Sequence, residues 1–400
     1  MNCEIPPFSV KLLRFRSGER HAAIVDGRGL LATQPGFYVM RSRRGREKSA
    51  GTDELRLRAV AVALNWASLR GIDLQARTES FELLGPDEID DLKDALRLNL
   101  RAAKGAKVNG TVKPGHFVNR CHAVRDYIVW HANLALHRIR VGDPRLPEAR
   151  LALDRFVKTI DSDLPSGGSG ERDPVHEDVL QEMLAAIVPG SPNNPFRPEH
   201  QHRNYALLLL YYETGMRRAE ALVLKGEDLV LHGAKPSVTV VRRPDDKDDR
   251  RKVEPRVKTL GREIPISAEL ARALDVWIKR HRNDPKRYPG ASKNSYVFLS
   301  QEGTELGLRT VNDMYDLLRD RIKTLPVGLT PHAKRHVANV RFSKKSRALG
   351  WTDGETELAR NYHFGWKKGS KQGAHYNREY AKEMAAQHVD AVQRKSTGAE

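Results

Sequence analysis

The spacing of apolar residues changes along the chain, and each change predicts a different kind of element. Between residues 53 and 160, apolar side chains recur every three or four positions, which is the spacing of one helix face. A first helix is expected to end at Gly71, and a second to begin behind Gly85 and Pro86. A third helix is expected to carry an apolar stripe from Phe117 onwards. This region therefore predicts a helical domain.

The first 52 residues show a different pattern, in which apolar and polar residues alternate around glycines. A period of two is typical of short strands with one buried face. The residues that predict strands here are Val10, Leu12, Ile24, Val25, Phe37 and Val39. The region ends in a basic run and is expected to be distinct from the helical domain.

The clearest break in the chain is the stretch 161–174, which is rich in glycine and serine and has no apolar spacing. Such a composition predicts a flexible linker. The remaining residues, 175–400, are expected to form a separate domain that begins with helical stretches near 176–187 and 202–212.

Two strands are expected within this second domain, Val238–Arg243 and Lys258–Ile266. The segment 244–252 between them is too charged to be buried, and we expect it to lengthen the tip of their hairpin. The whole pattern predicts a mainly α fold with a small β-sheet.

The charge balance indicates a polyanionic partner. The chain has 69 Lys and Arg residues against 51 Asp and Glu, which gives a formal net charge of +18 and a pI near 9.9. Such a chain attracts nucleic acid, although charge alone leaves DNA, RNA and an acidic membrane open. The basic positions that we expect to contact a phosphate backbone are Lys104, Lys107 and Lys113, in a glycine-containing loop, and Arg43 and Arg44. The N-terminal region is thus either an appendage with a solvated tail or a DNA-contacting arm.

The cysteine and histidine content argues against a metal centre or a disulfide framework. Cys3 and Cys121 are the only cysteines and stand far apart in the sequence. His116, His122 and His131 are expected as helix-surface or core residues, because no second cluster supplies the remaining metal ligands. No leader is evident and no apolar run approaches the roughly 20 residues that span a bilayer. We expect a soluble protein of the reduced bacterial cytoplasm, associated with the nucleoid, without metal or cofactor.

Candidate chemistry first occurs around Arg217. Thr214, Gly215, Arg217 and Glu220 follow an apolar helical run that ends at Tyr212. The pattern predicts a buried helix, a glycine turn and a second helix that begins near Arg217. An arginine on such a turn can present its rigid set of donors to a phosphate, and Glu220 can brace it. Taken alone, such an arginine–glutamate pair is more often a surface ion pair.

Two later segments carry further candidates. His332 and Arg335 stand one helical turn apart behind a Thr-Pro start signal, so both can face one ligand. Gly365 and Trp366 are followed ten residues later by Tyr376. Each pattern also has an ordinary explanation: a solvated helix start for the first, and a half-buried anchor of the final helix for the second.

Together these segments resemble the motifs of the tyrosine recombinases, also called phage-type integrases, a family that includes the Xer proteins and Cre. The T-G-x-R-x-x-E motif is matched from Thr214 to Glu220, and H-x-x-R by His332 and Arg335. The family's catalytic lysine occurs in a K-T-x-x-R-x-h-P-h context, where h is hydrophobic. The segment from Lys258 to Ile266 fits this context.

The third motif departs from the family's usual pattern. Where the family usually has a Gly-His pair nine or ten residues before its nucleophilic tyrosine, this chain has Gly365 and Trp366. The family tolerates tryptophan there, as in Cre. His363 is a rival for that role in a shifted register, and Tyr380 is an alternative to Tyr376 as the nucleophile.

The resemblance implies a reaction. Tyr376 would attack phosphorus, while Lys258 would protonate the departing 5′-oxygen. The charge that develops on the non-bridging oxygens would be stabilised by Arg217, Arg335, His332 and Trp366, with Glu220 in support. The covalent 3′-phosphotyrosine would conserve the bond energy, so that resealing requires no cofactor.

The resemblance also implies partners and an architecture. A helical core-binding domain and an α/β catalytic domain would form a C-shaped clamp on double-stranded DNA. Four copies on two duplexes, a dimer at each site, would exchange strands during integration or excision of a mobile element, with accessory proteins as further partners. The C-terminal helix would dock either on its own domain or on a neighbouring copy. Two alternatives remain: a type IB topoisomerase, and a DNA-binding protein without catalysis.

Overall fold

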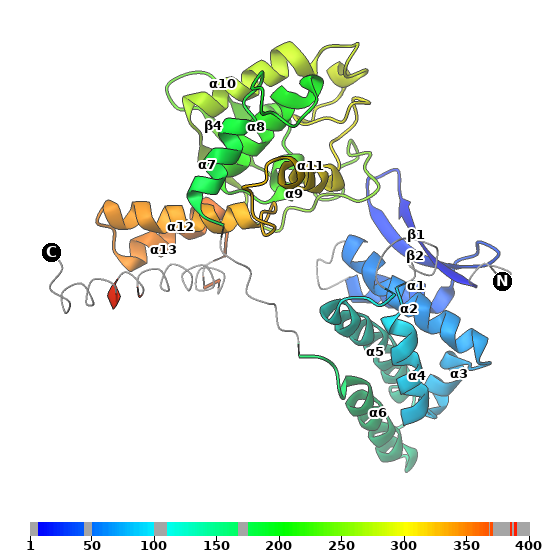
Figure 1. Ribbon diagram of the computed structural model, residues 1–400. Helices are drawn as coiled ribbons and strands as arrows, with labels where there is room; N and C mark the ends of the chain where they lie inside the picture. The colour runs from blue at the N-terminus through cyan, green and yellow to red at the C-terminus, as the bar shows by residue number, and fades with distance from the viewer. Residues whose placement is uncertain are drawn as a thin grey trace. The chain divides into compact units, whose positions relative to one another are not determined.

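The computed structural model describes residues 7–43, 50–99, 110–166, 175–367, 369–370, 385 and 388–389 (Figure 1). The chain divides into two compact units. The first comprises Met1–Gly170 together with Lys252–Glu254, and the second Glu171–Arg251 together with Pro255–Glu400. The fold is mainly helical with two small antiparallel sheets, as the apolar spacing predicts. No helix among the described residues is both long and apolar enough to cross a membrane.

The described residues of the first unit form a strand pair and six helices, which pack around one hydrophobic core. Its elements are β1 (Phe8–Arg14), β2 (Arg20–Asp26), α1 (Thr33–Arg43), α2 (Ala50–Leu69), α3 (Leu74–Ser80), α4 (Pro86–Arg97), α5 (Pro114–Leu136) and α6 (Arg145–Asp161). The core includes Ile24 from β2 and Val39 from α1, beside Leu57 of α2 and Val124 of α5. The N-terminal strand pair and α1 therefore share their core with the helices that follow.

The prediction of a strand at Phe37 and Val39 is wrong, because both residues lie in α1. Alternation would bury Phe37 and Val39 together, but Phe37 is 51% exposed whereas Tyr38 and Val39 are buried. The Tyr38 ring packs edge-on against Tyr127 of α5, with 5.5 Å between ring centroids. Two apolar residues were too few to distinguish a period of two from a helical stripe.

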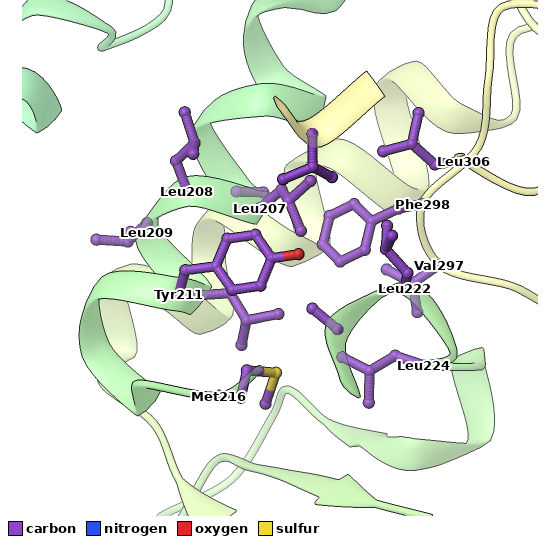
Figure 2. Packing of buried hydrophobic residues seen from close by; sticks show 14 of the residues in the cluster. Leu207, Leu208, Leu209, Tyr211, Met216, Leu222, Leu224, Val297, Phe298 and Leu306 are labelled. Atoms are coloured by element: carbon purple, nitrogen blue, oxygen red, sulfur yellow. The ribbon is translucent and has the colours of Figure 1, made fainter. Parts of the chain in front are cut away.

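The second unit is built around a central helix, α8 (Pro198–Thr214), which contacts α7, α9, α10 and α12. Leucines and Tyr211 of α8 pack against Leu222, Leu224, Val297 and Phe298 (Figure 2). The other helices are α7 (Glu177–Ala186), α9 (Arg218–Leu222), α10 (Ala268–Val276), α11 (Leu308–Arg321), α12 (Ala333–Ala348) and α13 (Asp353–Phe364), with short 3-10 turns at Gly226–Asp228 and Ala291–Lys293 and a π-helical stretch at Trp277–Arg282.

The sheet of this unit has the order β3 (Leu229–Val230), β4 (Ser237–Val240) and β5 (Arg262–Pro265), with antiparallel neighbours. The two strands expected from the sequence are present, but both are shorter than expected. Val238 pairs with Ile264, which fixes the register. Lys258 precedes β5 by four residues and lies in irregular backbone, so it is not a strand residue.

The charged segment 244–252 is partly buried, contrary to expectation. Asp249 is 1% exposed and pairs with the guanidinium of Arg251, whose Nη1 also donates to the carbonyl oxygens of Leu222 and Leu306, at 3.0 Å each. Lys225 Nζ lies 2.8 Å from Asp246 Oδ2. Because the buried Asp249 and Arg251 pair with each other, this part of the segment can be buried without isolated charges.

Candidate active site

The end of α8 is shaped by Gly215. This residue has φ +60°, and a Cβ at this position would lie 2.6 Å from the Cβ of Ala338 in α12 and 2.9 Å from Cε1 of Phe364 in α13. Glycine is thus required both for the left-handed backbone and for the close approach of two other helices. The turn brings the end of α8 close to Ala338 of α12 and to Phe364 at the end of α13.

Arg217 follows this turn and is the N-cap residue of α9. Its backbone N–H donates to Glu220 Oε2 at 2.9 Å, which closes a capping box. The side chain is 30% exposed, and Nη1 lies 3.7 Å from Glu220 Oε1. Nη1 is buried yet makes no hydrogen bond to the described residues. Arg217 is therefore held in place by a carboxylate and keeps donor capacity for a ligand.

Glu220 is the centre of the site's charge network and is completely buried. It accepts hydrogen bonds from Thr259 Oγ1 at 2.5 Å and from Arg262 Nη2 at 3.0 Å, and it lies 4.0 Å from Arg335 Nη1. Burial raises the pKa of Glu220, but the neighbouring guanidiniums of Arg262 and Arg335 outweigh it, so the pKa is lowered overall. Glu220 is accordingly a carboxylate, and its predicted bracing role extends to three arginines.

Arg335 lies beneath the surface, with its side chain 1% exposed. Nη1 donates to the Gly215 carbonyl oxygen at 3.0 Å, and Nη2 to the Phe364 carbonyl oxygen at 2.8 Å. Its guanidinium carbon lies 5.5 Å from the centroid of the Trp366 ring. Arg335 thus joins the glycine turn to the end of α13, and it supplies a buried positive charge to the site.

Trp366 is 5% exposed and stacks on Phe364, with 5.3 Å between ring centroids. Its approach depends on Gly365, which ends α13 with φ +65°. A Cβ at residue 365 would lie 2.7 Å from Nη1 of Arg262, and the Gly365 carbonyl oxygen accepts from the Leu260 N–H at 3.0 Å. The Gly-Trp pair is thus fixed against the segment that follows Lys258.

The two histidines have different environments. His332 is the N-cap residue of α12 and is exposed, with its ring 5.0 Å from that of His336. His363, the rival to Trp366, has Nε2 3.0 Å from the carbonyl oxygen of Thr214, to which it donates. Burial lowers the pKa of His363 to about 4. His363 is therefore neutral near pH 7 and already bonded to backbone, which favours Trp366 for the role.

Lys258 is exposed, but the residues on either side of it, Val257 and Thr259, are buried. Thr259 connects this segment to Glu220, so Lys258 stands one residue from the charge network. The sequence interpretation treated Thr259 and Arg262 only as context for Lys258 and missed their part in the site. The available signal was that Arg262 shares the buried face of its strand with Ile264.

Several predicted residues fall outside the described part of the chain. These are the expected nucleophile Tyr376, its alternative Tyr380, and the basic residues Lys104, Lys107 and Arg44. Arg43 ends α1, but its side chain is not described. Lys113 is the N-cap residue of α5 and is exposed. The structure thus unites Arg217, Glu220, Arg335 and Trp366, with Lys258 and His332 at the edges.

Residues 175–360 match the family model described as the phage integrase family. The catalytic domain belongs to this family. The match spans the T-G-x-R-x-x-E and H-x-x-R motifs and Lys258, and it confirms the resemblance to the tyrosine recombinases. The match supports a recombinase that cleaves and rejoins DNA. No curated protein matches the chain in sequence.

Solved structures of recombinases are similar to this chain at low identity. The XerA recombinase is 17% identical over 89% of this chain and 96% of its own, with a TM-score of 0.37. The Tn1549 transposon integrase in complex with transposon right end DNA is 16% identical over 87% of this chain and 99% of its own, with a TM-score of 0.48. The lambda integrase dimer bound to a COC′ core site is 12% identical over 86% of this chain and 94% of its own, with a TM-score of 0.47.

Proposed function

We propose that this recombinase cleaves DNA through Tyr376, with the cluster around Glu220 as its phosphate site and Lys258 as its general acid. The observation that carries the proposal is the convergence of residues from distant segments. Arg217, Arg335 and Trp366 come from three motifs and are joined by one buried carboxylate and one stacked ring. Such convergence of basic donors suits an oxyanion.

The two arginines have different parts in this site. Arg217 is 30% exposed, so the exposed part of its guanidinium can donate directly to a non-bridging oxygen. Arg335 has both terminal nitrogens bonded to backbone carbonyls, so it acts chiefly as a fixed positive charge below the phosphate. His332, exposed at the start of α12, supplies a further donor.

Within the proposal, one proton leaves the attacking tyrosine and another is given to the leaving oxygen. The phenol of Tyr376 loses its proton as the P–O bond to tyrosine forms, and the ammonium of Lys258 gives a proton to the 5′-oxygen as the P–O5′ bond breaks. The product is a 3′-phosphotyrosine and a free 5′-hydroxyl. Reversal of the same steps on a different 5′-end rejoins the strand, without metal or nucleotide.

The partner is double-stranded DNA, in line with the net charge of +18. Within the proposal, the two units close on one duplex, two copies occupy each site, and four copies exchange strands between two duplexes. The biological setting is integration or excision of a mobile element, with accessory proteins as further partners.

The nucleophile can be tested without knowing the natural site. Nicked suicide duplexes of randomised sequence are incubated with the protein, and covalent complexes are isolated and mapped by mass spectrometry. Tyr376→Phe should bind DNA but give no covalent complex, because only the hydroxyl is lost. Tyr362→Phe is a matched control, since Tyr362 is 63% exposed on α13 and should not affect capture. A covalent adduct on Tyr380 in the Tyr376→Phe variant would contradict the assignment.

A further inference from the structure

Arg262 makes contacts beyond its ion pair with Glu220 and the pairing of its strand. It begins β5, and its side chain is 1% exposed. Nε donates to the His363 carbonyl oxygen at 2.6 Å, and Nη2 donates to Glu220 Oε2 at 3.0 Å. Nη1 lies 3.3 Å from both Thr259 Oγ1 and the Leu260 carbonyl oxygen. One guanidinium thus joins the α13 end, the buried carboxylate and the two residues after Lys258.

These bonds matter because Lys258 itself lies in irregular backbone. A strand or helix would fix its direction through the ladder of hydrogen bonds, whereas here the direction depends on the residues that follow. Thr259 is held by Glu220 and Arg262, and Leu260 by Arg262 and the Gly365 carbonyl oxygen. A general acid must stand within hydrogen-bond reach of the leaving oxygen, so a small shift of this segment reduces proton transfer.

We propose that Arg262 is a positioning residue that holds the Lys258 segment against the Gly365–Trp366 turn, so that the lysine reaches the leaving 5′-oxygen. This inference rests on the proposed function of Lys258. The Arg262 side chain is 1% exposed, so it would act through Thr259 and Leu260 and not by contact with the reacting atoms. The glycine at position 365 supports this role, because a Cβ there would occupy the space of the Arg262 guanidinium.

The test compares two leaving groups in single-turnover cleavage. One substrate is a suicide duplex, selected by covalent capture, with an ordinary 5′-oxygen at the cleaved bond, and the other carries a 5′-bridging phosphorothiolate. Sulfur departs without a proton, so the second substrate does not need the general acid. The variants are Arg262→Lys and Thr259→Val. Each should slow cleavage of the oxygen substrate by about tenfold or more relative to the sulfur substrate, within the 10²- to 10⁴-fold contribution of a general acid.

Arg251→Lys is the matched control. Arg251 is likewise a buried arginine that pairs with a carboxylate, Asp249, and donates to two backbone carbonyls. Its bonds hold Asp249, Leu222 and Leu306 in place, so their loss should slow both substrates equally. Thr259→Val keeps the shape of the side chain and preserves the test if Arg262→Lys does not fold.

The outcomes separate the inference from the function on which it rests. Selective loss on the oxygen substrate in both Arg262→Lys and Thr259→Val supports the inference. Equal loss on both substrates, as expected for Arg251→Lys, overturns it. Lys258→Ala is run in parallel: if that variant also loses both substrates equally, the general-acid role of Lys258 is itself wrong. If only Lys258→Ala shows selective rescue by sulfur, the general-acid role of Lys258 is supported and the positioning role of Arg262 is wrong.

Discussion

Replacement of Gly215 by alanine should be the most informative single change in the described part of the site. The new Cβ would lie 2.6 Å from Ala338 Cβ and 2.9 Å from Phe364 Cε1, neither of which is the end of a flexible side chain. The backbone would also have to hold φ +60° with a side chain present. Moreover, the Gly215 carbonyl oxygen is an acceptor for Arg335, so a shift of this turn moves a charged group of the site.

The magnitude follows from two separate costs. A left-handed conformation costs an L-residue roughly 1–2 kcal/mol. Overpacking of a close contact costs about 1–3 kcal/mol more. Gly215→Ala should therefore lower the free energy of unfolding of the second unit by roughly 2–5 kcal/mol.

Gly350→Ala provides the matched control. Gly350 also follows a helix and has φ +73°, but a Cβ there would meet nothing within 4 Å. Only the backbone cost, about 1–2 kcal/mol, should remain. The difference between the two variants then isolates the helix contacts around Gly215.

Hydrogen exchange followed by mass spectrometry is the suitable assay, because two units need not unfold together and peptides report on each separately. Protection should fall in α8, α12 and α13 of Gly215→Ala, whereas α2 and α5 should be unchanged. If Gly350→Ala were as destabilising as Gly215→Ala, the close approach of the helices would not be the reason for glycine at this position.

Three further predictions concern charged residues. Burial holds the pKa of Lys334 well below its ordinary 10.5. Between this lowered pKa and 10.5, the lysine is protonated in the unfolded chain but neutral in the folded one. The free energy of unfolding therefore rises with pH over that range. Lys334→Met should be more stable than the natural chain near pH 7, with the gap closing towards pH 10 in urea unfolding; a gap that does not change with pH would contradict this. Glu220→Gln leaves buried guanidiniums without their counter-ion and should cost about 3–5 kcal/mol in the same assay, and a cost below about 1 kcal/mol would refute the network. Arg217→Lys should reduce single-turnover cleavage by about 10²-fold or more, yet change the salt slope of DNA binding by no more than about one counterion, so parallel losses would make Arg217 a phosphate anchor.

The sequence was sufficient for the features that depend on local pattern. The apolar spacing predicts the helices around Gly71, Gly85 and Phe117, and the structure confirms α2, α4 and α5 there. The glycine turn before Arg217 is also confirmed, because the helix that ends at Thr214 and the positive φ of Gly215 are both encoded within a few residues. Motif spacing then predicts the members of the site, and the structure brings four of them together.

Features that depend on distant partners could not be predicted. Charged residues in the segment 244–252 indicated an exposed tip, because a single sequence does not reveal that Arg251 meets two carbonyls from other elements. The same limit concealed Arg262, whose acceptors include His363, about a hundred positions away. Whether a charged residue can be buried depends on the partners that it meets in the fold. The residue type alone indicates only that charged residues are usually exposed.

The charges around Glu220 have a consequence for the reaction itself. Three guanidiniums, those of Arg217, Arg262 and Arg335, surround one carboxylate, so three positive charges less one negative leave a net charge of +2 in this cluster, the proposed phosphate site. Glu220, Arg262 and Arg335 are almost fully shielded from water, and their field is therefore weakly screened. In the proposed reaction, a field of this sign would stabilise the charge that gathers on the phosphate oxygens. The single carboxylate bridges the three arginines, and it leaves a larger positive balance than two carboxylates would.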